Sequence, residues 1–134
     1  MDTTNKPSCR IVIAGGRTFQ DFNLLSTKCK EILSDILETK NVIILSGGAK
    51  GADQLGERFA MENNLELEYH QADWKSFGKR AGLIRNAQMA ENADILIAFW
   101  DGQSKGTEHM INSAYQNGLR VEIIPYEVDG QQIL

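Results

Sequence analysis

The sequence predicts an α/β protein in which a mainly parallel, five-stranded sheet lies between two layers of helices. Five short apolar runs rich in Val and Ile alternate with segments whose apolar residues recur at helical spacing. Strands that alternate with helices are joined by right-handed crossovers, which place helices on both faces of a parallel sheet. Hydrophobic residues make up 42% of the 134-residue chain, enough for one folded core. We therefore expect a single Rossmann-like three-layer α/β/α domain over residues 9–134, preceded by a flexible tail over residues 1–8.

The first half of the chain begins with a predicted buried strand that stops at Gly15-Gly16. The expected elements are strand 10–14, helix 24–37, strand 42–45 and helix 51–64. Both strands are continuous apolar runs, which is typical of buried parallel strands. Either Asp21 or Asn23 is available as the N-cap of the first helix.

The second half begins with alternating apolar and polar residues from Leu65 to His70, which predict a strand with one wet face near the sheet edge. The remaining expected elements are helix 79–92, strand 94–99, helix 107–117 and strand 121–125. Strand 94–99 is the most apolar and is expected in the centre of the sheet. Gly118 is the expected C-terminal glycine cap of the last long helix, and a short hairpin is expected around Asp129-Gly130.

Glycine-rich segments follow the predicted strands, at the edge where open parallel sheets bind their ligands. After the four strands in turn, the candidate residues are Gly15, Gly16 and Arg17; Ser46, Gly47, Gly48, Lys50, Gly51 and Asp53; Asp73, Trp74 and Gly78; and Trp100, Asp101, Gly102, Ser104, Lys105, Gly106 and Thr107. The turns at the opposite edge contain mostly Lys, Glu, Asn and Thr. The convergence of these loops predicts a ligand site at the carboxyl ends of the strands.

The segment from Ser46 to Asp53 joins a predicted strand directly to a helix. Glycine lets the backbone approach a phosphate closely, and the free N–H groups of a helix start supply donors and a favourable dipole. The segment matches neither a P-loop nor the G-x-G-x-x-G motif, and the alternative is a tight turn with Asp53 beside the helix N-terminus. The segment before the last helix is similar, with Thr107 as either an N-cap or a phosphate contact.

Arg85 and Asn86 lie in an otherwise apolar helical segment, where a guanidinium needs an anionic partner. That partner is either a ligand phosphate or a carboxylate such as Asp94 or Asp53. Arg17, directly after the first glycine pair, is interpreted in the same way, as a phosphate contact or the partner of a carboxylate.

Composition excludes several classes of function. The net charge of −4 disfavours a long polyanion as ligand but allows a local basic pocket. Cys9 and Cys29 are expected to be buried free thiols, and no cluster of residues has metal-ligand spacing, so neither a metal nor a cofactor is expected. No apolar run approaches the roughly 20 residues of a membrane span, and the polar start lacks a secretory signal, so we expect no membrane contact and a cytoplasmic protein.

Several of these segments occur together in a known family. They are Gly15-Gly-Arg17 with Phe19 and Asp21, Ser46-Gly-Gly-Ala-Lys-Gly-Ala-Asp53, Ala72-Asp-Trp74, Ala81-Gly82, Arg85-Asn86 with Met89, and Gly106-Thr107. As a set they resemble the YspA-type branch of the SLOG superfamily, a Rossmann-like group that includes the Smf/DprA and LOG proteins. The resemblance covers roughly residues 10–125. It implies a nucleotide or nucleotide-derived ligand and, for the superfamily, ligand sensing in phage-conflict or NAD/ADP-ribose-linked systems.

The LOG proteins are phosphoribohydrolases that cleave an N-glycosidic bond. Met110 stands where their Gly-Thr-x-x-Glu motif has its glutamate, and a thioether can neither activate water nor stabilise an oxocarbenium ion. Glu108 lies two residues earlier, roughly 200° away around the helix. If the chain is an enzyme, the resemblance therefore points to a nucleotide N-glycosidase that uses Arg85 and a relocated carboxylate, Asp53 or Asp101.

The DprA proteins bind single-stranded DNA. Trp74, Phe77 and Trp100 are the aromatic residues that could stack on bases, with charge from Lys75, Lys79 and Arg80, but the acidic total disfavours a large footprint.

Four hypotheses follow, in decreasing order of preference. The first is a small-ligand module that holds a phosphorylated nucleotide on the two glycine-rich loops, with Arg17 and Arg85 neutralising charge and Trp74 or Trp100 stacking on the base. The others are a nucleotide N-glycosidase, a single-strand DNA-binding protein, and a structural or interaction role. The apolar character of the 79–92 helix also allows a homodimer.

Overall fold

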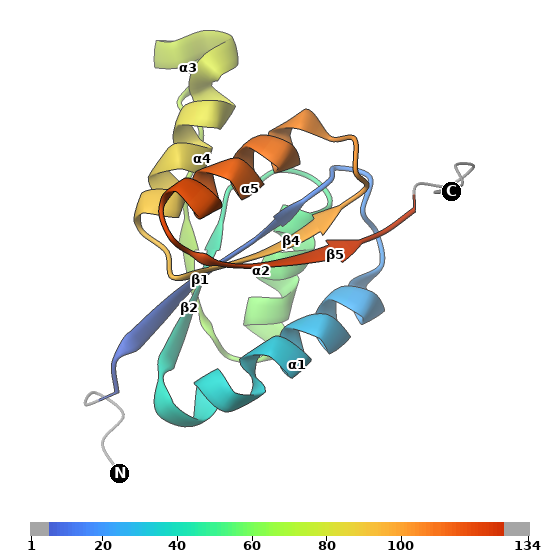
Figure 1. The fold of residues 1–134 in the computed structure, drawn as a ribbon, viewed down its shortest axis with the longest axis vertical. Coiled ribbons are helices and arrows are strands. Elements are labelled where there is room, and N and C mark those ends of the chain that lie inside the picture. Colours follow the sequence, from blue (N-terminus) through green and yellow to red (C-terminus); the bar gives the residue numbers. More distant parts are fainter. Residues whose placement is uncertain (1–5, 128–134) are drawn as a thin grey trace.

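The computed structural model describes residues 6–127 and contains one five-stranded parallel sheet in the order β3-β2-β1-β4-β5 (Figure 1). The strands are β1 (Ser8–Gly15), β2 (Asn41–Ser46), β3 (Glu66–Tyr69), β4 (Ile95–Trp100) and β5 (Arg120–Pro125). Every neighbouring pair is parallel, as the alternation of strands and helices predicted. The predicted Rossmann-like α/β fold is therefore confirmed.

Helices cover both faces of the sheet (Figure 1). The helical elements are α1 (Phe22–Thr39), α2 (Ala52–Glu62), α3 (Trp74–Phe77), the 3-10 helix η2 (Gly78–Arg80), α4 (Ala81–Glu91) and α5 (Lys105–Gln116). Buried residues of α1 and α2 pack with one face of the sheet, and those of α4 and α5 pack with the other. Within residues 6–127, no helix combines the length and the apolar character needed to cross a bilayer.

Successive side chains of β1 supply both cores, because side chains of a strand alternate between the faces of its sheet. Ile11 and Ile13 join the core under α1 and α2, whereas Val12 and Ala14 join the core under α4 and α5. All four residues are buried. This two-sided burial explains why the strand is a continuous run of apolar residues.

Several local predictions are confirmed. Asp21 is the N-cap of α1, where its side chain accepts a hydrogen bond from the backbone N–H of Leu24. The alternating strand β3 lies at a sheet edge. Cys9 and Cys29 are buried free thiols, and burial raises the pKa of Cys29 to about 12.

The centre of the sheet differs from the prediction. The strand expected there is β4, but β1 is the middle strand and β4 lies beside it. Both strands are buried between helices on two faces, so their apolar content does not distinguish the two positions.

The start of the last long helix also differs, because α5 begins at Lys105 with Ser104 as its N-cap. The carbonyl of Ser104 accepts the first helical hydrogen bond, from the N–H of Glu108 at 3.1 Å. Thr107 thus lies in the first turn and is not the N-cap.

No helix or strand was predicted between residues 70 and 79, but Trp74–Phe77 form the short helix α3. Asp73 caps this short helix by accepting a hydrogen bond from the N–H of Ser76 at 3.1 Å.

At the N-terminus, β1 begins at Ser8, inside the predicted tail, and the carbonyl of Pro7 accepts a hydrogen bond from the N–H of Asn41. The hairpin predicted around Asp129-Gly130 lies outside the described residues.

The loop after β1 is tied to the start of α2 by one carbonyl. Gly16 O accepts hydrogen bonds from the N–H groups of Ala52 and Phe19, both at 3.2 Å. Gly51 packs against the same carbonyl, since a Cβ at this position would lie 2.3 Å from Gly16 O. Gly51 also has a φ of +82°, a conformation that side chains disfavour. The contact between the first two strand-to-helix loops thus requires glycine at position 51 for two reasons, the close approach to Gly16 O and the positive φ.

We expect Gly51→Ala to lower the free energy of unfolding by about 2 kcal/mol or more, because backbone strain of order 1–3 kcal/mol adds to a steric collision. Urea denaturation measures the loss. Gly102→Ala is the matched control, since Gly102 has a φ of +81° but nothing within 4 Å of an added Cβ. An equal loss in both variants would show that the Gly16 contact does not require glycine.

Candidate functional site

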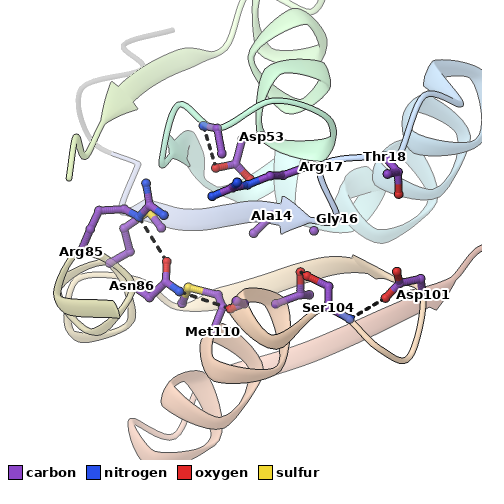
Figure 2. Close-up of a pocket in the computed structure, with 15 residues that line it drawn as sticks. Ala14, Gly16, Arg17, Thr18, Asp53, Arg85, Asn86, Asp101, Ser104 and Met110 are labelled. Carbon is purple, nitrogen blue, oxygen red and sulfur yellow. Dashed lines mark hydrogen bonds between the residues drawn. The ribbon is translucent and has the colours of Figure 1, made fainter. Parts of the chain in front are cut away.

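A pocket of about 390 Å³ lies over the carboxyl end of β1, between the loop that enters α2 and the start of α5. Figure 2 shows Asp53 and Arg17 on one side of this strand end, and Ser104, Asp101 and Met110 on the other. Its lining residues are Ala14, Gly15, Gly16, Arg17, Thr18, Ala49, Asp53, Arg85, Asn86, Met89, Asp101, Ser104, Gly106, Thr107 and Met110. Because β1 pairs with β2 on one side and β4 on the other, the connections diverge at this point, where ligands of open α/β sheets bind.

A second pocket of about 530 Å³ adjoins the first. It is lined by Arg17, Gly47, Gly48, Ala49, Lys50, Gln71, Ala72, Trp74 and Arg85. The two pockets share Arg17, Ala49 and Arg85. The two arginines thus stand at the boundary between the pockets.

Asp53 is a buried carboxyl in the first turn of α2, with 5% of its surface exposed. Its Oδ2 accepts a hydrogen bond from the N–H of Ala49 at 3.2 Å. Burial raises the pKa of Asp53 to about 6, and the hydrogen bond from Ala49 and the charge of Arg85 oppose this rise only in part. The group can therefore change its protonation state near neutral pH.

Arg85 and Asn86 connect two loops of the site from neighbouring positions in α4. Arg85 Nη1 donates to the carbonyl of Gly47 at 2.7 Å, and its Nε donates to Asn86 Oδ1 at 3.1 Å. Asn86 Nδ2 in turn donates to the carbonyl of Gly106 at 3.3 Å. This chain of hydrogen bonds, which we call the Arg85–Asn86 bridge, joins the loop before α2 to the first turn of α5.

The structure also decides between the two carboxylates considered as partners for Arg85. Asp94 lies elsewhere and accepts a hydrogen bond from the N–H of Arg10 at 2.9 Å. Asp53 is the carboxylate whose charge acts on Arg85, although burial outweighs it and lowers the pKa of the guanidinium. A Cβ at Gly47 would lie 2.8 Å from Arg85 Nη1 and 2.9 Å from Asp53 Oδ2, so the two groups flank a position that admits no side chain.

Arg17 is an exposed cation that lines both pockets. Among residues 6–127 no hydrogen bond or ion pair to its side chain is formed. Its charge acts on Arg85 and helps to lower the pKa of that guanidinium. Two like charges therefore face one site, an arrangement that an anion between them would stabilise.

The loop between β4 and α5 forms the other side of the first pocket. Asp101 Oδ1 accepts hydrogen bonds from the N–H groups of Gln103 and Ser104, both at 2.8 Å. Trp100 Nε1 donates to the carbonyl of Ser104 at 3.0 Å. These contacts fix the start of α5, whose first-turn N–H groups lack partners within the helix.

The structure brings most of the predicted site residues to the two pockets, but not all. Those that line a pocket are Gly15, Gly16, Arg17, Gly47, Gly48, Lys50, Asp53, Trp74, Arg85, Asn86, Asp101, Ser104, Gly106 and Thr107. The predicted residues that line neither are Ser46, Gly51, Asp73, Gly78, Trp100, Gly102 and Lys105. Ser46 is buried beneath the loop, where its hydroxyl donates to Glu57 Oε2 at 2.6 Å and accepts from the N–H of Gly48 at 3.1 Å.

Some lining residues were not among the predicted site residues. They are Ala14, Thr18, Ala49, Met89 and Met110 in the first pocket, and Gln71 and Ala72 in the second. Helical spacing could have indicated Met110, because it lies three residues after Thr107 and so shares the same face of α5. In the described part of the chain, no three His, Cys, Asp or Glu side chains are grouped so that they could hold a metal ion.

Comparisons with known proteins agree with this architecture. A sequence model of the YspA, cpYpsA-related SLOG family matches residues 9–77, from β1 to the end of α3. The Gene 61 protein of Mycobacterium phage D29 is 35% identical over 120 residues, an alignment that covers 84% of this chain and 93% of the phage protein.

Two solved structures have a similar fold. DNA processing protein A (DprA) from Streptococcus pneumoniae superposes with a TM-score of 0.68 at 17% identity, covering 96% of this chain and 54% of the DprA chain. The structural-genomics target TM1055 superposes with a TM-score of 0.58 at 21% identity, covering 87% of this chain and 72% of that chain. At these identities the likeness shows the fold alone, and this chain spans about half the length of DprA.

Asp53→Asn is expected to stabilise the protein, and more so at high pH. The pKa of Asp53 is raised from 3.8 to about 6, so folding favours the protonated carboxyl. The contribution of Asp53 to the free energy of unfolding is therefore complete below pH 3.8 and is lost as the pH rises through about 6. At 1.36 kcal/mol per pH unit, the variant should gain up to about 3 kcal/mol at pH 8 and about half of that at pH 5. Asn retains an oxygen that can accept the hydrogen bond from Ala49.

Urea denaturation at the two pH values measures this gain. Asp35→Asn is the control, because Asp35 is exposed on α1 and its carboxylate is solvated in both states. A gain that is the same at pH 5 and pH 8 would contradict the titration assigned to Asp53.

Proposed function

The chain belongs to the YspA, cpYpsA-related SLOG family, and we propose that it binds a phosphorylated, nucleotide-type small ligand in the first pocket. The observation that carries the proposal is the pair Arg17 and Arg85, two guanidinium groups that face one cavity. Arg17 forms no hydrogen bond or ion pair among residues 6–127, whereas Asp53 is the carboxylate whose charge acts on Arg85. The guanidinium of Arg17 therefore carries a positive charge that has no partner within the described residues.

The backbone around the pocket supports a phosphate as the neutralising group. The pocket lies beside the first turns of α2 and α5, whose N–H groups and helix dipoles favour an anion. Guanidinium groups bind phosphate oxygens through paired, charge-assisted hydrogen bonds. We therefore place the phosphate between Arg17 and the loop that contains Ala49.

The remaining walls of the pocket suit the uncharged part of a nucleotide. Ala14, Met89 and Met110 are buried and supply apolar surface. Ser104 and Thr107, whose hydroxyl oxygens lie 3.2 Å apart, supply polar groups to the lining. Small-molecule sites commonly combine an apolar lining with a few such polar groups.

A single-stranded nucleic acid is a less favoured ligand. The net charge of −4 opposes a long polyanion, and the likeness to DprA extends to the fold of about half of that protein. Binding that requires an oligonucleotide and ignores mononucleotides would reverse this preference.

Isothermal titration calorimetry with AMP, GMP, CMP and UMP tests the proposal. At least one should bind, and Arg17→Ala should weaken it roughly 10- to 100-fold, since a hydrogen bond to a charged group contributes about 1.5–3 kcal/mol. Arg58→Ala is the control, because Arg58 pairs with Glu62 on α2 and lines neither pocket. The absence of binding by all four nucleotides would overturn the proposal.

A second candidate is hydrolysis of the N-glycosidic bond of such a nucleotide. It is favoured by the presence of two carboxyl groups, Asp53 and Asp101, in the pocket that would hold the ligand. With a pKa of about 6, Asp53 can give or take a proton near neutral pH, as general acid–base catalysis requires. Water would add to the sugar carbon as the base departs, giving free base and ribose 5-phosphate.

Chromatography of each nucleoside monophosphate after incubation with the protein tests this second candidate. We expect free base to accumulate, and Asp53→Asn to reduce its rate at least 100-fold, the lower end of the effect of a general acid or base. Asp35→Asn serves as the control. Binding without release of base would leave the ligand-binding proposal standing and exclude hydrolysis of these substrates.

A further inference from the structure

We propose that Tyr126 is a positioning residue, which holds Arg17 over the first pocket by clamping the neighbouring Thr18 from outside that pocket. Tyr126 follows the last strand, 108 positions after Thr18 in the sequence, and lines neither the first pocket nor the second. It therefore acts on a ligand only through residues that do line the site. The inference rests on the proposed function and goes beyond it, because it assigns a role to a residue that the ligand does not touch.

Arg17 and Thr18 are the two central residues of a tight turn that follows β1. The turn is closed by a hydrogen bond from the N–H of Phe19 to the carbonyl of Gly16 at 3.2 Å. Both ends of the turn are fixed, since the N–H of Gly16 donates to the carbonyl of Phe99 at 3.0 Å and Phe19 is buried. The two central residues are exposed, so burial does not hold them in place.

Tyr126 supplies a contact to one of these two residues. Its hydroxyl oxygen lies 3.0 Å from Thr18 Oγ1, within hydrogen-bond distance. The side chain of Arg17 has no hydrogen bond or ion pair to another group of residues 6–127 that would hold it. The hydrogen bond between Thr18 and Tyr126, which we call the Tyr126 clamp, therefore restrains the turn from the position next to Arg17.

The side chains of the turn point in different directions, which separates the clamp from the ligand. In Figure 2, Arg17 extends towards the side of the pocket that carries Asp53 and Arg85, whereas Thr18 lies on the side away from them. A ligand between the two arginines would therefore leave the Tyr126 clamp in place.

Tyr126 is itself held by the sheet and by the core. Its N–H donates to the carbonyl of Trp100 at 3.2 Å, at the end of β4. Its ring packs edge-on against Phe19 with the ring centroids 4.9 Å apart, and Phe19 stacks on Phe99 at 4.8 Å. Aromatic pairs in these arrangements are stabilising beyond the area that they bury. The hydroxyl thus has a defined position from which to act on the turn.

Gly16 lets the hydroxyl of Tyr126 come this close to the turn. A Cβ at Gly16 would lie 1.8 Å from the hydroxyl oxygen of Tyr126. Tyr126 therefore packs against the residue before Arg17 and bonds to the residue after it. Burial raises the pKa of Tyr126, so the hydroxyl keeps its proton at neutral pH and can donate it to Thr18.

The clamp affects anion binding because Arg17 carries the unpartnered positive charge of the pocket. A turn that is held in place before the ligand arrives loses less conformational entropy when its arginine binds a phosphate. One hydrogen bond contributes modestly in net terms, so the expected effect on affinity is several-fold rather than many orders of magnitude.

Tyr126→Phe tests the proposal, because it removes the hydroxyl and retains the ring that packs on Phe19. In ¹⁵N relaxation measurements, the backbone order parameters of Arg17 and Thr18 should fall from roughly 0.85, typical of rigid backbone, towards 0.6. In calorimetry, the affinity for the nucleoside monophosphate that binds best should fall roughly 2- to 10-fold. In an Arg17→Ala background, the same substitution should change the affinity less than twofold, because the clamp acts through Arg17.

Tyr115→Phe is the matched control. Tyr115 is 60% exposed on α5 and lines neither pocket, so its hydroxyl should affect neither the order parameters of the turn nor the affinity. Thermal unfolding of both variants confirms that the fold is retained.

The order parameters are measured without a ligand, so the outcomes separate this inference from the proposed function. Unchanged order parameters of Arg17 and Thr18 in Tyr126→Phe would refute the clamp. An equal loss of affinity with and without Arg17 would show that Tyr126 acts through the fold as a whole, and would also refute it. Lower order parameters in a protein that binds no nucleotide would support the clamp and overturn the proposed function.

Discussion

The Arg85–Asn86 bridge is the interaction on which the geometry of the carboxyl edge depends. It joins the carbonyl of Gly47, before α2, to the carbonyl of Gly106, in the first turn of α5. A half-buried guanidinium that lost these acceptors would be poorly solvated, so the bridge holds α4 in one position relative to both loops. Since α2 and α5 cover opposite faces of the sheet, the bridge also sets the width of the first pocket.

The sequence was sufficient to predict the sheet, the helical layers and the edge that carries the site, because each depends on local patterns. Continuous apolar runs mark strands buried on two faces, and glycine clusters at strand ends mark loops that approach one another closely. The sequence also showed that Arg85 requires a partner. It could not choose between Asp53 and Asp94, because that choice depends on where α4 lies over the sheet. In the structure Arg85 also donates a hydrogen bond to the backbone carbonyl of Gly47. A backbone acceptor of this kind cannot be predicted from residue type.

The roles that sequence could not assign are those decided by capping and by the short helix α3. Asp73 and Trp100 follow strands and have side chains suited to ligand binding, yet Asp73 caps α3 and Trp100 Nε1 donates to the backbone of Ser104. Neither contact is visible until the chain after β3 and the loop after β4 adopt their turns. The second pocket has the same origin, because α3 brings Trp74 beside the loop that carries Lys50.

Asp53 and a bound phosphate would compete for the same positive charge. The carboxyl acts electrostatically on Arg85, and the proposed phosphate would lie in the pocket that this guanidinium lines. Ionised Asp53 weakens the attraction for an anion, whereas neutral Asp53 leaves both arginines available. By thermodynamic reciprocity, a phosphate that binds best to the neutral form raises the pKa of Asp53 still further. Burial of Asp53 behind Gly47, where a carboxylate costs most, thus favours anion binding, and the buried Met110 on the opposite wall adds no negative charge to oppose it.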